Sequence, residues 1–164
     1  MGEANASTAH DAPCLSVLIA TLDGKRFAFP LDEVVEVLPA MAVVPLPKTP
    51  PVICGLVNLR GTPLPLLDLR VRLGRPSRGP DPADHVVVCR VRDRHVGVWV
   101  DNAADVTEIA TDDLVAITDI AEAANVKGVA LLGDGILLVC DVGSFLDADE
   151  ALRLDGAMPE SMAG

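Results

Sequence analysis

The fold is decided by the stretch between residues 55 and 70, which reads GLVNLRGTPLPLLDLR. Apolar runs at 55–59 and 63–67 flank the turn residues Arg60 and Gly61, and this pattern predicts a hairpin of two β-strands. Asparagine and glycine form such turns in many β proteins, so the hairpin alone indicates a fold class and not a function.

Further short apolar runs, each ended by turn residues, lie on both sides of this hairpin. Asp23-Gly24 is a strong hairpin signal. Eight prolines fall between Pro30 and Pro65, and at that density they exclude long helices and central strands. The pattern predicts a mainly β chain, with further strands at residues 15–22, 27–29, 85–91, 95–100, 106–109, 126–132 and 136–140.

Three segments predict helices instead. Residues 31–38 place three acids among aliphatic residues and end at Pro39, and acids near a helix start suit the helix dipole. Residues 118–124 predict a short helix. Residues 145–154 predict a longer, amphipathic one.

The loop at residues 74–84, GRPSRGPDPAD, separates the strands into two groups. Two groups of short strands predict two small β-barrels. A barrel of about 60 residues buries too little surface to be stable alone, so we expect the two to share an interface core. We therefore expect a disordered N-terminal extension at 1–14, a central domain at 15–146, and a C-terminal helix and tail at 147–164.

Composition and charge exclude some classes of partner. The chain has 164 residues, of which 50% are hydrophobic, enough for a real core. Its formal net charge is −11, with +1 on residues 1–100 and −12 on residues 101–164. There is no tyrosine, and few aromatic rings are available to stack on bases. We expect no nucleic-acid partner.

Residues 1–13 have neither the basic region nor the apolar segment of a signal peptide. No uncharged run is long enough to cross a bilayer. The four cysteines form no CxxC pair, and three of them lie inside apolar runs. We expect reduced thiols in a cytoplasmic protein that does not insert into a membrane; the cysteines are Cys14, Cys54, Cys89 and Cys140.

The chain contains none of the familiar catalytic or phosphate-binding motifs. His85 and His95 are expected far apart on neighbouring strands, and the clustered acids near residues 112 and 149 lack the spacing of a calcium loop. We expect no enzymatic activity, no metal and no cofactor.

Eight arginines lie between Arg60 and Arg94. A basic strand edge that discourages aggregation explains such a run. A β-barrel that binds an anionic ligand through this cluster is an alternative function from another class.

The whole string at 55–70 resembles the signature of the CheW-like domain of bacterial chemosensory systems. That signature is glycine, two hydrophobic residues and NLRG, followed by proline, two hydrophobic residues and DLR. The resemblance covers about residues 15–146 and continues through FAFPL at 27–31, VVEV at 34–37, VGVWVD at 96–101, VKGVA at 126–130 and DGILLV at 134–139.

This resemblance implies two packed SH3-like, five-stranded β-barrels with short helices. It also implies a non-enzymatic adaptor that links the cytoplasmic hairpin tips of chemoreceptors to the regulatory domain of the histidine kinase CheA. In the family, an acidic residue at the position of Glu36 and a basic residue at the position of Arg60 pair near a groove that binds the receptor. The resemblance therefore assigns the groove to Val34, Glu36, Val37, Asn58, Leu59, Arg60 and Gly61, and it assigns no residues to the kinase interface.

The chain departs from the family pattern in its N-terminal extension, in the proline-rich segment 39–51 and in the arginine-rich loop 74–84. These departures leave the receptors and the pathway open. The alternative is the same adaptor role in a non-flagellar chemosensory pathway, such as pilus-based motility or second-messenger control.

Overall fold

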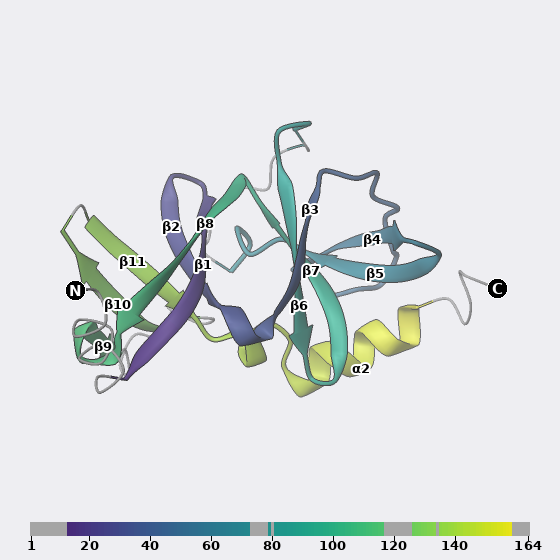
Figure 1. Cartoon of the computed structure of the whole chain (residues 1–164). Coiled ribbons are helices and arrows are strands. Elements are labelled where there is room, and N and C mark those ends of the chain that lie inside the picture. The colour runs from purple at the N-terminus through teal and green to yellow at the C-terminus, as the bar shows by residue number, and fades with distance from the viewer. Residues whose placement is uncertain (1–12, 73–78, 80, 117–125, 134, 159–164) are drawn as a thin grey trace.

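Two β-sheets lie side by side in the computed structural model, which describes residues 13–72, 79, 81–116, 126–133 and 135–158 (Figure 1). A single short α-helix packs beside one of them within these residues. The mainly β class with two sheets of about five strands, expected from the sequence, is confirmed.

The first sheet, sheet A, has six strands in the order β8-β1-β2-β11-β10-β9. Its strands are antiparallel except for β2 and β11, which run parallel. The strands of sheet A enclose a small aliphatic core around Val17, Ala28 and Ile109. The strands are β1 (Cys14–Leu22), β2 (Lys25–Pro30), β8 (Asn102–Ala110), β9 (Leu114–Ala116), β10 (Val126–Leu132) and β11 (Gly135–Cys140).

The second sheet, sheet B, has five strands in the order β3-β6-β7-β5-β4. Pro63 and Pro65 lie where β5 pairs with β4 alone, because its parallel pairing with β7 begins only at Leu66. Proline has no backbone N–H to donate, so these positions avoid the loss of hydrogen bonds between β5 and β7. The strands are β3 (Val34–Pro39), β4 (Ile53–Leu59), β5 (Thr62–Leu67), β6 (His85–Val91) and β7 (Arg94–Val100).

The expectation that loop 74–84 divides the two barrels is wrong. Strands from both sides of that loop, β3–β5 and β6–β7, belong to sheet B. The chain starts in sheet A, makes all of sheet B, and returns to sheet A at β8. The strands were grouped by their proximity in sequence, but β6 pairs with β3, which lies on the other side of the loop. The loop itself lies mostly outside the described residues.

The largest core lies between the two sheets and is shared by them, as expected. Residues 86–91 of β6 alternate between two apolar environments: Val87 and Cys89 face the shared core, whereas Val86 and Val88 face the interior of sheet B. Phe29 and Phe145 meet edge to face in the shared core, with ring centroids 6.0 Å apart.

The helix predicted at residues 31–38 is wrong. The segment forms a short 3-10 helix, η1 (Leu31–Glu33), followed by strand β3. Its Val-Val-Glu-Val run is rich in β-branched side chains, which favour strands, and its residues alternate between half-buried and exposed. Pairing with β6 satisfies the backbone.

The amphipathic helix predicted near the C-terminus exists but begins three residues later, as α2 (Ala148–Ala157). Asp147 and Glu150 form a capping box at its start. Phe145 and Leu146 are fully buried before the helix rather than in it. Two further 3-10 turns are η2 (Thr111–Asp113) and η4 (Val142–Ser144).

The remaining expectations on element boundaries concern the ends of the chain. Cys14, expected at the end of a disordered extension, already belongs to β1, while residues 1–12 lie outside the described residues. The helix predicted at residues 118–124 also lies outside them. None of the described helices combines the length and apolar character needed to cross a bilayer.

Candidate functional site

Glu36 and Arg60 form an exposed ion pair, with Arg60 Nη2 2.5 Å from Glu36 Oε2. Arg60 keeps 70% of its side chain exposed, whereas Glu36 keeps 31%. The two residues are 24 positions apart in sequence, and the contact expected between them is present. An exposed pair of this kind contributes at most about 1 kcal/mol to stability, so its exposure points to a role at the surface.

Arg60 lies in a tight turn with a defined backbone conformation. Arg60 and Gly61 both have positive φ, at 51° and 88°, the pattern of the tight turns that match the twist of a hairpin. Asn58 Oδ1 accepts a hydrogen bond from the Gly61 backbone N–H at 2.7 Å. Asn58, Arg60 and Gly61 therefore act together, since the amide fixes the turn and the turn aims the guanidinium.

The ion pair joins the two ends of sheet B. Glu36 lies on β3 and Arg60 directly follows β4, and these strands are first and last in the order of the sheet. The segment after β3 makes a second contact with β4, in which Val44 and Leu56 exchange two backbone hydrogen bonds of 2.8 Å. The site therefore sits where sheet B closes on itself.

The three aliphatic residues predicted for the groove have different surroundings. Val34 packs against the core between the sheets, and Leu59 packs against the interior of sheet B. Val37 is exposed, as are its neighbours Leu31 and Val35. The structure thus brings Glu36 and the turn residues together, and it places only Val37 of the three aliphatic residues in solvent.

A cleft of about 530 Å³ lies beside the Arg60 turn. It is formed by the β4–β5 and β6–β7 hairpins with the C-terminal end of α2, and not by the two sheets. It is lined by Leu59, Thr62, Pro63, Leu64, Pro65, Arg90, Asp93, Arg94, His95 and Met158.

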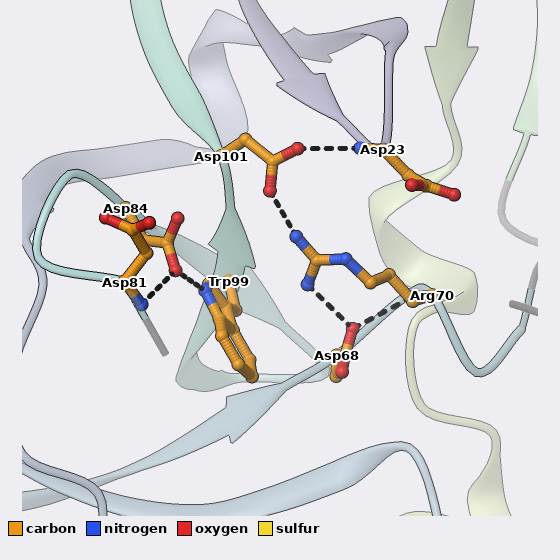
Figure 2. A network of polar contacts seen from close by, with 7 residues as sticks. All are labelled: Asp23, Asp68, Arg70, Asp81, Asp84, Trp99 and Asp101. Atoms are coloured by element: carbon orange, nitrogen blue, oxygen red, sulfur yellow. Dashed lines mark hydrogen bonds and ion pairs between the residues drawn. The ribbon is translucent and has the colours of Figure 1, made fainter. Parts of the chain in front are cut away.

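Sequence reasoning missed a second polar cluster, which is buried (Figure 2). Arg70 is only 2% exposed, yet its guanidinium contacts both Asp68 Oδ1, at 3.3 Å, and the carboxylate of Asp101. Its Cζ lies 5.0 Å from the centre of the Trp99 ring. Asp101 also accepts a hydrogen bond of 2.8 Å from the Asp23 backbone N–H.

This buried cluster ties the two sheets together. Asp23 lies in the β1–β2 turn of sheet A, Arg70 follows β5 of sheet B, and Asp101 lies between β7 and β8. A buried charge is costly unless it is paired, so the cluster has a structural role. The available signal was a charged residue directly after each of two apolar runs, at Asp68 and Asp101.

Most of the described arginines in the run make contacts within the chain. Five of its six described members have partners within the chain, and three of these contact the C-terminal segment. Arg72 pairs with Glu150, Arg94 pairs with Asp155, and Arg92 Nε donates to the Leu146 carbonyl at 2.8 Å. This use weighs against a basic surface built for an anionic ligand. Arg75 and Arg78 lie outside the described residues.

The four cysteines form no disulfide within the part of the chain that the structure describes. Cys89 and Cys140 are buried, Cys54 is half-buried and Cys14 is exposed. Burial raises the pKa of Cys54 and of Cys89 to about 12 and raises the pKa of Cys140 well above 9.0. These three thiols are therefore protonated at neutral pH and poorly nucleophilic.

His85 and His95 lie far apart on the β6–β7 hairpin, as expected, opposite Val100 and Arg90 respectively.

Comparison with known proteins gives the family. The model of the CheW-like domain matches residues 16–150. The chain belongs to the CheW-like domain family. The chemotaxis protein CheW of Klebsiella aerogenes is 28% identical over 141 residues, which cover 84% of this chain and 85% of that protein. CheW of Thermotoga maritima is 28% identical over 138 residues, which cover 84% and 87%.

Solved structures share the fold of this CheW-like chain. The crystal structure of the scaffolding protein TtCheW from Thermoanaerobacter tengcongensis matches with a TM-score of 0.76 at 21% identity. The match covers 84% of this chain and 96% of that one. The chain is thus a CheW-like protein, and the curated relatives it resembles are named chemotaxis proteins.

Proposed function

We propose that this CheW-like protein couples the cytoplasmic hairpin tips of chemoreceptors to a CheA-type histidine kinase in the cytoplasm. The observation that carries the proposal is the exposed Glu36–Arg60 pair at the closure of sheet B. An arginine guanidinium has five donors in a fixed fork, so pairing with one glutamate oxygen leaves donors for a second carboxylate.

A receptor tip is a helical hairpin, and a helix is bound through an apolar stripe flanked by oriented polar contacts. We expect the apolar area to come from the exposed side chains of Leu31 in η1 and of Val35 and Val37 on β3, the strand that also carries Glu36. Glu36 holds Arg60 in place through the contact at 2.5 Å. In this proposal Val34 and Leu59 support the groove from beneath, because both pack against cores.

The kinase is expected to bind a separate surface of the protein. This separation makes the proposal testable, because a change at Arg60 then affects one partner and not the other. The experiment is a reconstituted mixture of receptor, kinase and the CheW-like protein, in which receptor-dependent autophosphorylation of CheA is measured.

Arg60→Glu is expected to lower receptor-dependent activation about tenfold or more, because reversing an oriented charge costs a contact about 1.4 kcal/mol or more. Arg153→Glu is the matched control, since Arg153 is an exposed arginine on α2. Kinase binding is measured for both variants and is expected to match that of the original protein. If Arg60→Glu activates the kinase as well as Arg153→Glu does, the proposed receptor groove is wrong.

A further inference from the structure

The cleft of about 530 Å³ beside the Arg60 turn lies where two hairpins of sheet B are not paired with each other. Strands β5 and β7 pair only at Leu66 and Leu67 of β5, so nothing joins the β4–β5 and β6–β7 hairpins between there and their turns. The space between these hairpins is the cleft. Leu59 lines it, but neither Glu36 nor Arg60 does.

The lining of this cleft combines an apolar wall with an exposed cation. The wall is formed by Leu59, Pro63, Leu64 and Pro65. Arg94 also lines the cleft, but it is already paired with Asp155. Arg90 is exposed beside His95, and its side chain makes no ion pair or hydrogen bond with any residue that the structure describes. A fitting occupant therefore carries apolar side chains and an acid, and Asp93 in the lining disfavours several acids.

The last turn of α2 fixes the place from which the following segment starts. Leu154 is fully buried in the shared core, and Met158 itself lines the cleft. Figure 1 shows the helix, in yellow, ending below the β4–β5 hairpin. Met158 has φ −70° and ψ 139°, an extended conformation, and the proline at position 159 keeps the preceding residue extended. The chain therefore leaves the helix at the edge of the cleft.

Residues 159–164 follow Met158 and lie outside the described residues; they read PESMAG. This segment has the composition that the cleft favours, with one acid, Glu160, one large apolar residue, Met162, and no basic residue. Six extended residues reach about 20 Å, whereas residues 62–65 of β5 span about 13 Å. Side chains two positions apart on an extended chain face the same side, so the acid and the methionine can enter the cleft together.

We propose that residues 159–164 bind in this cleft, with Glu160 against Arg90 and Met162 against the apolar wall. An exposed ion pair contributes little by itself. A segment that starts at the edge of its own binding site, however, has an effective concentration on the order of millimolar. Contacts that are too weak to hold a free peptide are therefore sufficient for this tethered segment.

The methyl group of Met162 tests the proposal in the whole isolated protein. The chain has four methionines, so ¹³C labelling of methionine methyl groups gives few peaks. The Met162 peak is expected to lie away from its position in a free peptide of residues 159–164. It is also expected to show a nuclear Overhauser contact with a methyl group of Leu59 or Leu64. Dilution by about tenfold is expected to leave the peak in place, because the contact lies within one chain.

Variants test the ion pair. Arg90→Glu is expected to return the Met162 peak to the free-peptide position, because it sets a like charge against Glu160. Arg153→Glu is the matched control and is expected to leave the peak displaced, since Arg153 is exposed on α2 and does not line the cleft. Arg90→Glu combined with Glu160→Arg is expected to restore the displacement. The indole N–H peak of Trp99, the only tryptophan, shows that each variant is folded.

The proposal is overturned if the Met162 peak of the original protein coincides with that of the free peptide, since the cleft is then open to another protein. Displacement that persists in Arg90→Glu also overturns it. Displacement that is lost on dilution does so as well, because the segment then binds a second copy of the chain. These outcomes do not depend on receptor coupling, because neither receptor nor kinase is present.

Discussion

Two arginines of the stretch at residues 55–70 have opposite surroundings. Arg60 extends from a turn into solvent, while Arg70, ten positions later, is buried between two carboxylates. Exposed pairs contribute little to stability, whereas a buried pair that loses one partner leaves an uncompensated charge. The contrast separates Arg60, which we propose contacts the receptor, from Arg70, whose buried contacts stabilise the fold.

Arg70→Met is expected to lower the free energy of unfolding by about 3–5 kcal/mol, because the Asp68 carboxylate stays buried without its cation. Arg60→Ala is the matched control and is expected to change it by less than about 0.5 kcal/mol. Urea titrations of both variants measure the difference. Equal midpoints would show that the buried cluster is not a structural tie.

The buried thiols predict how stability depends on alkaline pH. Burial raises the pKa of Cys89 from 9.0 to about 12. The unfolded chain therefore loses this proton at lower pH than the folded chain does, and the free energy of unfolding falls as pH rises from about 9 towards 12. Cys89→Ala is expected to fall less steeply over this range, and urea midpoints at pH 8, 9.5 and 10.5 measure both slopes. Parallel slopes would contradict the assignment.

At the scale of elements, the closure of sheet B depends on a close backbone approach. Gly55 has φ at 152°, and a Cβ there would lie 2.3 Å from the Val44 carbonyl oxygen. That carbonyl accepts the hydrogen bond from the Leu56 N–H that holds segment 40–52 against β4. No side chain fits at this position without moving backbone atoms.

Gly55→Ala is therefore expected to cost at least about 1–3 kcal/mol, as overpacking does. Gly133→Ala is the matched control, because a Cβ at Gly133 meets nothing within 4 Å. Thermal unfolding of both variants measures the cost. A melting temperature for Gly55→Ala equal to that of the control would mean that segment 40–52 yields without penalty.

The hairpins were predictable from the sequence because each contains a pair of residues that favours a tight turn. Asp23-Gly24 and Arg60-Gly61 both adopt positive φ and join the strands expected on either side. The conformation of residues 31–38 was not predictable, because a short apolar run is equally compatible with a strand and with a helix. Pairing with β6 makes most of the segment a strand. The parallel contacts of β2 with β11 and β5 with β7 join distant segments, which no local pattern reveals.

The candidate site divides in the same way. The Glu36–Arg60 contact was expected because a known family pairs these positions, not because of any local signal. Arg70 was missed because the burial of a charged residue cannot be inferred from its neighbours in sequence. An arginine that follows leucines at the end of a strand is usually exposed, whereas Arg70 is buried. The family signature contains both residues and does not distinguish their tasks.

At the scale of the whole molecule, the shared core makes the two sheets one cooperative unit. We expect urea unfolding to show a single transition. Trp99 fluorescence reports on sheet B, and labelling of Cys140 reports on sheet A in a variant whose other three cysteines are alanine. Coincident midpoints are expected from both probes on this variant. Midpoints that differ would mean that the sheets unfold separately.

The order of strands along the chain also sets an order during synthesis on the ribosome. Sheet B is complete once residue 100 has emerged, but β2 has to wait for β11, more than a hundred residues after it, before both of its edges are paired. At about 5–20 residues per second, the β1–β2 hairpin waits several seconds for β11. Until then the core residues available to Phe27 and Phe29 are those of the hairpin itself and those of sheet B. The nascent chain thus depends on sheet B to shelter the first hairpin until the rest of sheet A exists.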